Sequence, residues 1–216
     1  MATENQIKQL KIKTEYITSY HLKPGSDRVL IFLHGFKQDG MGFYNPLKSF
    51  IPESFYHHIP NGPYPVPIRV EKQYKMAYSW YFFDAPNSQF VRDMSLALQT
   101  VSDQLRAEKI SDLKKVIIGF SQGGYLAPYL GASLGNVEKI IGVHCRYRHE
   151  DFKKPFDFPI YSIHGMDDQI VNPKGAEESF KKLLHLGNQG EFIKLRETAH
   201  EVNQSVGDTV KRILDM

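Results

Sequence analysis

The stretch from Lys115 to Ala127 constrains the fold more than any other part of this sequence. It begins with a short apolar run rich in β-branched residues, which predicts a buried strand. The turn that follows has the pattern Gly119-x-Ser121-x-Gly123 and leads into a segment with helical apolar spacing. In so tight a turn, side chains two positions before and after the serine would collide, which favours glycine at both. The pattern predicts a strand, a sharp turn exposing Ser121, and a helix whose free N–H groups favour negative charge there.

Strands and helices alternate along the rest of the chain. Beyond one or two edge strands within 7–21, the expected strands are 28–33, 55–59, 115–120, 139–143, 158–164 and 191–195. The expected helices are one that ends at Phe50, one after Ser121, and those at 87–109, 173–186 and 201–214. This alternation predicts an α/β fold with a mostly parallel sheet and helices on both of its faces.

Residues 60–86 do not follow this alternation. They combine several prolines with a dense set of aromatic residues, and we expect them to be irregular in backbone structure. So many aromatic side chains in a loop-like stretch indicate a cover over a pocket, with Trp80 facing the substrate. The alternative is a packed surface loop that contributes to the hydrophobic core.

Length, charge and cysteine content restrict the class of protein. A chain of 216 residues suits one domain, 1–216, and its formal net charge of +3 is too small and scattered to indicate nucleic-acid binding. The single cysteine, Cys145, excludes an internal disulfide and favours a reducing, cytoplasmic location. The N-terminus lacks the apolar region of a secretion signal, and no apolar run approaches the ~20 residues of a membrane helix.

An acid and a histidine follow Ser121 at the places where a serine hydrolase needs them. A serine hydroxyl is a poor nucleophile unless a neighbouring base removes its proton, and a carboxylate must orient that base. The strand that ends at His164 runs into Asp167 and Asp168, and the last strand runs into a loop that contains His200. The order of serine, acid and histidine is the one found in α/β-hydrolases.

Four motifs together resemble the phospholipase/carboxylesterase family, which includes the acyl-protein thioesterases and small bacterial carboxylesterases. They are Leu33-His34-Gly35-Phe36, Gly119-Phe120-Ser121-Gln122-Gly123-Gly124, His164-Gly165-x-x-Asp168-x-x-Val171 and the late His200. The resemblance runs from about Leu30 to the C-terminus and implies the α/β-hydrolase fold. Ser79-Trp80 followed by Asp84 is similar to a Ser-Trp-Phe-Asp element of that family, stretched here by inserted aromatic residues.

The resemblance also implies roles for individual residues. Its spacing selects Asp168 rather than Asp167 as the acid, with Ser121 as nucleophile and His200 as base. The oxyanion would be held by the backbone N–H groups of Phe36 and Gln122, and the Phe36 ring would form a wall of the acyl pocket. The other histidines show no metal-ligand spacing, so we expect no metal and no cofactor.

One segment departs from the family pattern. After strand 139–143 the family has a small Ser-Gly pair, whereas this chain reads His144-Cys145-Arg146-Tyr147-Arg148. The two arginines either add charge to the acyl channel or point into solvent, and the sequence leaves both possibilities open. Cys145 is interpreted as a small packing residue because nothing nearby in sequence would lower its pKa.

These features favour a serine hydrolase that cleaves carboxylic esters or thioesters through an acyl-enzyme. Its substrate would be a small acyl ester or thioester, or an acylated protein. One alternative is a binding protein on an inactive hydrolase scaffold, and a second is a peptidase of the same fold. The sequence does not determine the oligomeric state.

Overall fold

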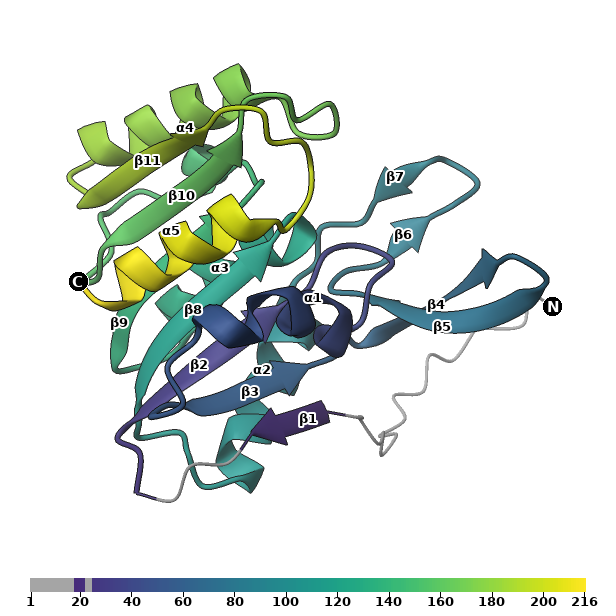
Figure 1. Cartoon of the computed structure of the whole chain (residues 1–216), viewed down its shortest axis with the longest axis horizontal. Helices are drawn as coiled ribbons and strands as arrows, with labels where there is room; N and C mark the ends of the chain where they lie inside the picture. The colour runs from purple at the N-terminus through teal and green to yellow at the C-terminus, as the bar shows by residue number, and fades with distance from the viewer. Residues whose placement is uncertain (1–17, 22–24) are drawn as a thin grey trace, which may run out of the picture.

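A seven-stranded, mostly parallel β-sheet forms the centre of the protein (Figure 1). The computed structural model describes residues 18–21 and 25–216 of the chain. In spatial order, the strands are β1 (Thr18–His21), β3 (Tyr56–Pro60), β2 (Arg28–Leu33), β8 (Lys114–Phe120), β9 (Val137–Val143), β10 (Ile160–Gly165) and β11 (Gly190–Leu195). Within this sheet only the edge strand β1 is antiparallel to its neighbour. The carboxyl ends of the six other strands therefore meet at one edge, where open α/β sheets bind their ligands.

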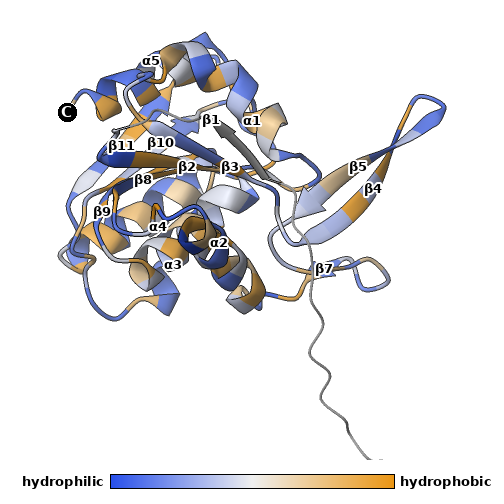
Figure 2. Cartoon of the chain, turned by 90° about the horizontal axis from the view of Figure 1, so that it is seen from below, coloured by the Kyte–Doolittle hydropathy of each residue, from blue (hydrophilic) through white to orange (hydrophobic). Residues whose placement is uncertain are grey.

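Helices cover both faces of the sheet (Figure 2). On one face lie α1 (Gly40–Leu47), continued by the 3₁₀ turn η1 (Lys48–Phe50), and α5 (Gln204–Leu214). On the other face lie α2 (Ser95–Ala107), α3 (Gln122–Ser133) and α4 (Pro173–His185), with the 3₁₀ turn η2 (His149–Asp151) in the loop after β9. The predicted α/β architecture is confirmed.

Alternation of side chains along the buried strands builds the two halves of the core. In β2, Leu30 and Phe32 pack in one apolar cluster with the residues of α1 and α5. Val29 and Ile31 point to the opposite face and pack in the cluster that includes α2, α3 and α4. An interior parallel strand is covered on both sides, which explains why β2 is apolar throughout. No helix among the described residues is both long and apolar enough to span a membrane.

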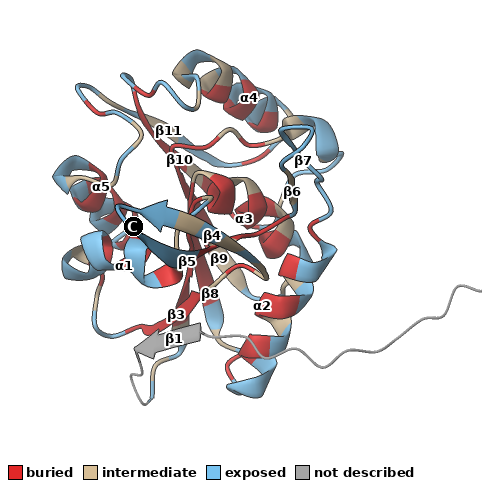
Figure 3. Ribbon diagram, turned by 90° about the vertical axis from the view of Figure 1, so that its right-hand side faces the viewer, coloured by how far each residue is buried: buried red, intermediate tan, exposed pale blue. Residues whose placement is uncertain are grey.

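The expectation of an irregular backbone over residues 60–86 is wrong. β4 (Tyr64–Val70) and β5 (Gln73–Ser79) form a long antiparallel hairpin, which projects from the body of the protein (Figure 1). Figure 3 colours much of this hairpin as exposed. The prolines of β4, Pro65 and Pro67, occupy alternate positions of an edge strand, where a missing N–H disrupts no ladder. The tip of this hairpin lies in solvent, and Tyr74 is 78% exposed.

The long helix expected at 87–109 begins eight residues later, at Ser95. A second, short hairpin precedes it, with β6 (Phe83–Asp84) paired to β7 (Gln89–Phe90). Phe90 packs against the rings of Phe36 and Phe83 instead of extending the apolar stripe of α2. Phe90 has the spacing of the apolar residues of α2 only by coincidence. It lies outside that helix, and its partners are aromatic residues from other segments. The edge strands expected within 7–21 lie outside the described residues except for β1.

Candidate active site

Ser121 lies in a strained turn at the carboxyl end of β8. Its backbone has φ 49° and ψ −113°, a conformation that non-glycine residues rarely adopt. A Cβ on Gly119 would lie 2.4 Å from the carbonyl oxygen of Gly123, and a Cβ on Gly123 would lie 2.1 Å from that of Leu33. The N–H of Ser121 donates to the carbonyl of Val143 on β9 at 2.9 Å, which holds the turn in place. The glycines thus permit the turn, and the turn places Ser121 at the N-terminus of α3 beside a cavity.

Asp168 and His200 form a hydrogen-bonded pair at the same edge of the sheet. Nδ1 of His200 lies 2.8 Å from Oδ2 of Asp168, and Oδ1 of Asp168 accepts the N–H groups of Ile170 and Val171, each at 2.8 Å. Burial would raise the pKa of Asp168, but the hydrogen bonds from His200 and from the two backbone groups outweigh it and lower this pKa. The carboxylate is therefore ionised, holds the Nδ1 proton of His200, and leaves Nε2 as the basic nitrogen.

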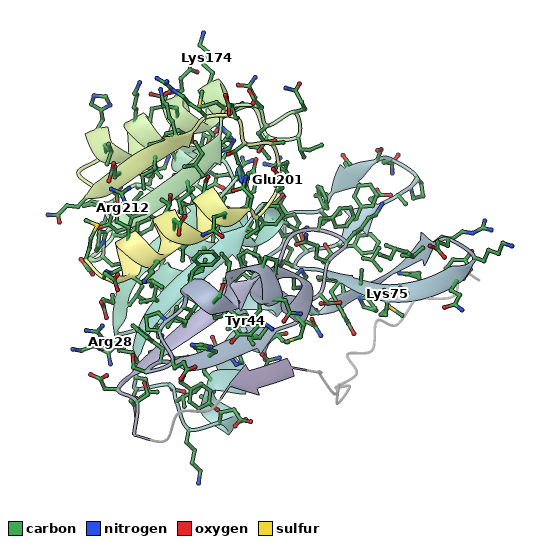
Figure 4. All side chains as sticks on the ribbon, in the orientation of Figure 1. Arg28, Tyr44, Lys75, Lys174, Glu201 and Arg212 are labelled. Atoms are coloured by element: carbon green, nitrogen blue, oxygen red, sulfur yellow. The ribbon has the colours of Figure 1, made fainter. Side chains whose placement is uncertain are left out.

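The loops that carry the acid and the histidine are joined through Gly165. A Cβ on Gly165 would lie 2.2 Å from the carbonyl oxygen of Thr198, so only glycine permits this approach. The N–H of Asp167 donates to the same carbonyl at 3.0 Å, and the N–H of Met166 donates to that of Leu195 at 2.8 Å. This explains the glycine of the His-Gly pair in the sequence motif. In Figure 4, the labelled Glu201, the residue after His200, lies near the N-terminal end of α5 at this edge of the sheet.

Phe120, the residue before Ser121, contacts His200. The ring of Phe120 packs against the imidazole of His200 with their centroids 4.9 Å apart. Within the described part of the chain, Ser121 makes no side-chain hydrogen bond to His200. Catalytic hydrogen bonds in many enzymes tighten only when the substrate binds.

Two further histidines lie beside Asp168, an arrangement that no sequence pattern indicated. Nε2 of His164 lies 3.4 Å and Nδ1 of His144 lies 3.5 Å from Oδ2 of Asp168. Burial lowers the pKa of His164, and it lowers that of His144 to about 4. Nδ1 of His144 accepts the N–H of Gly165 at 3.1 Å. Both rings are therefore neutral and hold the loops without competing with His200 for the charge of Asp168.

Among the described residues, His144, Asp168 and His200 form a group whose ligand atoms lie within 4.8 Å of one another. These are the residues that could hold a metal. However, the oxygens of Asp168 are already engaged by His200 and by two backbone N–H groups. The arrangement fits a hydrogen-bonded acid–base pair better than an open coordination site.

The side chain of Gln122 makes contacts that the sequence did not indicate. Its Oε1 accepts the N–H of Trp80 at 3.0 Å, and its Nε2 donates to Oγ of Ser79 at 2.9 Å. These bonds join the start of α3 to the end of β5. The backbone N–H of Gln122 lies in the first turn of α3, where helices lack intrahelical acceptors.

Phe36 lies in the loop after β2, and its backbone is held from both sides. The N–H of Gly35 donates to Oε1 of Gln38 at 2.9 Å, and the N–H of Lys37 donates to the carbonyl of Tyr78 at 3.1 Å. The loop abuts the start of α3, since a Cβ on Gly123 would lie 2.7 Å from the carbonyl oxygen of His34. The N–H groups of Phe36 and Gln122 thus lie on segments that touch beside Ser121.

Trp80 does not face the substrate, contrary to the sequence-based expectation. Its side chain is completely buried, and Nε1 donates to the carbonyl of His34 at 2.8 Å. His34 itself donates from Nδ1 to the carbonyl of Gly35 and accepts the N–H of Gly62 on Nε2. Burial lowers the pKa of His34 to about 4, so this ring is a neutral part of the loop. Trp80 and His34 therefore stabilise the loop after β2 that carries Phe36.

A cavity of about 500 Å³ opens beside Ser121, a volume typical of small-molecule sites. Its apolar wall consists of Phe36, Tyr81, Phe90, Met94, Ile170 and Val171. Tyr81 belongs to the region 60–86 that the sequence indicated as an aromatic cover, and Phe90 follows shortly after it. The tip of the β4–β5 hairpin, in contrast, points into solvent. The short β6–β7 hairpin brings Phe90 to this wall, where its ring packs against those of Phe36 and Tyr81.

The segment that departs from the family pattern is divided between the core and the cavity. Cys145 is buried against α3, where a Cβ on Gly124 would lie 2.5 Å from its Sγ, and burial raises the pKa of its thiol. Arg146 forms an ion pair with Glu150, whereas Arg148 lines the cavity. Of the two arginines, only Arg148 adds charge to the cavity beside Ser121, whereas Arg146 does not line it.

Comparisons with known proteins agree with this fold. A family model described as phospholipase/carboxylesterase matches residues 20–215. Acyl-protein thioesterase 1 homolog 2 of Dictyostelium discoideum is 25% identical in an alignment 215 residues long, gaps included. The alignment covers 86% of this chain and 92% of the relative. The solved structure of acyl-protein thioesterase 2 from Zea mays has a TM-score of 0.73 at 18% identity, covering 93% of this chain and 98% of that one. The carboxylesterase of Bacillus cereus has a TM-score of 0.73 at 15% identity, covering 93% of each chain. The two structures show the α/β-hydrolase fold.

Proposed function

The chain belongs to the phospholipase/carboxylesterase family, and on this basis we propose that it is a serine hydrolase cleaving carboxylic esters or thioesters through an acyl-enzyme. One observation carries the proposal: a buried carboxylate holds Nδ1 of His200 at 2.8 Å beside a serine in a strained turn. This is the constellation that activates a weak nucleophile.

In the proposed reaction, Oγ of Ser121 attacks the carbonyl carbon of the substrate while Nε2 of His200 removes the hydroxyl proton. The negative charge on the carbonyl oxygen is stabilised by the N–H groups of Phe36 and Gln122. His200 then gives its proton to the leaving alcohol or thiol, and the acyl–oxygen or acyl–sulfur bond breaks. Water attacks the acyl-enzyme by the same route, releasing the free acid and restoring Ser121. Asp168 stabilises the charged imidazole in each half of the reaction.

The substrate proposal remains at the level of acyl esters and thioesters. The Dictyostelium relative is named an acyl-protein thioesterase, so an acylated protein is included among the proposed substrates. The aromatic and aliphatic wall of the cavity suits an acyl group near Ser121. The proposed chemistry needs only these side chains and water, and a cytoplasmic location stays a prediction.

The test is covalent labelling of Ser121 by a fluorophosphonate. The probe should add to the wild-type protein, and Ser121→Ala should abolish both labelling and hydrolysis of an activated acyl ester. The rate loss should be on the order of 10⁴ or more, because the three residues act as a unit. Labelling at a different serine, or a folded wild type that cleaves no activated ester, would instead support a binding protein on a hydrolase scaffold.

A further inference from the structure

The cavity beside Ser121 has an unusual charge distribution. Arg92 and Arg148 line it together with apolar residues, and no aspartate or glutamate is among its lining residues. Both arginines also line a neighbouring hollow, which contains Asp151. Arg92 and Arg148 therefore lie between the cavity beside Ser121 and the neighbouring hollow.

The charge of Arg148 is compensated and that of Arg92 is not. Nε of Arg148 lies 3.0 Å from Oδ2 of Asp151, which also accepts a hydrogen bond from the hydroxyl of Tyr129. Over residues 25–216, Arg92 forms no ion pair. An arginine has five N–H donors, so the bond to Asp151 leaves most of those on Arg148 for another acceptor. One net positive charge thus remains at this part of the cavity.

Both charges act on the buried part of the cavity. Tyr81, which is 5% exposed, forms part of the wall. Burial raises the pKa of its phenol, while Arg92 and Arg148 both act to lower it. The two guanidinium groups therefore act on a buried side chain in the wall of this cavity, where electrostatic interactions are stronger than at the surface.

We propose that the cavity accepts esters or thioesters that carry an anionic group, a carboxylate or phosphate, held by Arg92 and Arg148. This inference rests on the proposed function, because it names the substrate class of the same site. Guanidinium groups bind carboxylates and phosphates through paired N–H donors, and such charge-assisted bonds are stronger than neutral ones. An entirely apolar substrate filling the same space would cover Arg92 without giving it a partner and would leave the remaining N–H donors of Arg148 unused, which is unfavourable.

The anionic group belongs either to the acyl part or to the leaving group, and matched substrates separate the two. The first pair is the 4-nitrophenyl ester of glutaric acid and the same ester with its free carboxylate methylated. The second pair is 4-butyryloxybenzoate and its methyl ester. The readout is the ratio of kcat/KM for the anionic and neutral members, because a variant that only damages the fold lowers both.

In the wild type, the anionic member of at least one pair should be favoured by about tenfold or more, the effect of one charge-assisted hydrogen bond. Arg92→Gln and Arg148→Gln should each reduce this ratio, and so should high salt. Asp151→Asn should increase the ratio, because it removes the carboxylate that compensates Arg148. Arg146→Gln is the matched control, since Arg146 lies in the same loop and pairs with Glu150 but does not line the cavity.

Fluorophosphonate labelling of Ser121 in the same preparation separates failure of this inference from failure of the proposed function. If Ser121 is labelled and neutral esters are cleaved while neither anionic substrate is favoured, the inference alone is wrong. An equal loss of the ratio in Arg146→Gln and Arg148→Gln would also overturn it, because only the general positive potential would then matter. Without labelling or ester cleavage, the proposed function itself fails.

Discussion

The fold gives Asp167 and Asp168 opposite surroundings although the two residues are adjacent. Asp168 is 4% exposed and bonded to His200, whereas the side chain of Asp167 lies in solvent. We predict that Asp168→Asn lowers kcat on the order of 10⁴-fold, because an amide cannot hold the Nδ1 tautomer of His200. Asp167→Asn is the matched control and should change kcat little. Steady-state hydrolysis of an activated ester measures both, and the opposite ranking would show that Asp167 is the acid.

At the scale of elements, the contact between α3 and β2 determines the position of the serine. A Cβ at Gly123 would overlap the carbonyl of Leu33, so Gly123→Ala must push α3 away from the sheet. We predict a loss of about 1–3 kcal/mol in the free energy of unfolding, together with loss of fluorophosphonate labelling. Gly135→Ala is the control, because nothing lies within 4 Å of the added carbon there. Urea unfolding measures the stability, and similar values for both variants would contradict the packing argument.

The hairpin of β4 and β5 is a separable element. Its tip is exposed, Figure 4 shows Lys75 on the part of the hairpin that projects from the body, and the hairpin contributes no lining residue to the cavity. We predict that replacing residues 69–74 with Asn-Gly, a two-residue hairpin turn, leaves ester hydrolysis and the unfolding temperature nearly unchanged. The aromatic cover expected from the sequence would then be formed by Tyr81 and Phe90, which line the cavity and lie outside the replaced segment. A large fall in kcat/KM for a soluble activated ester would show that the tip takes part in the cover.

For the whole protein, buried histidines make stability depend on pH. Burial lowers the pKa values of His34, His58 and His144 to about 4 from an ordinary value of 6.5. Between these values the unfolded chain binds more protons than the folded one, so stability is fully present above pH 6.5 and is lost as pH falls toward 4. The maximum slope is about 1.4 kcal/mol per pH unit for each histidine.

Urea unfolding between pH 7.5 and 4.5 measures this dependence. We expect the free energy of unfolding to decrease steadily across the window, and His34→Gln to have a shallower decrease than the wild type. A free energy that stays constant from pH 7 to pH 5 would show that these histidines do not contribute as their burial implies.

Local chain properties determined most of the framework. The glycine spacing around Ser121 identified the turn because the clash that it avoids lies within five consecutive residues. The order of Asp168 and His200 after later strands predicted that the two would lie close together, since parallel strands bring their carboxyl ends to one edge. The wrong expectations concern residues whose partners are distant in sequence. The prolines of β4 indicated an irregular segment where the β4–β5 hairpin forms. Phe90 has a spacing that fits an N-terminal extension of α2, although it lies outside that helix.

Only the tertiary structure decided what surrounds the site. His144 and His164 reach Asp168 from two different strands, Trp80 turns inward to bond His34, and Arg92 and Arg148 meet at one cavity. Sequence patterns record spacing along the chain, so they identify turns, strand faces and residue order. Which side chains become neutral, buried or paired depends on contacts between segments far apart in the chain, and these contacts form only when the sheet brings the segments together.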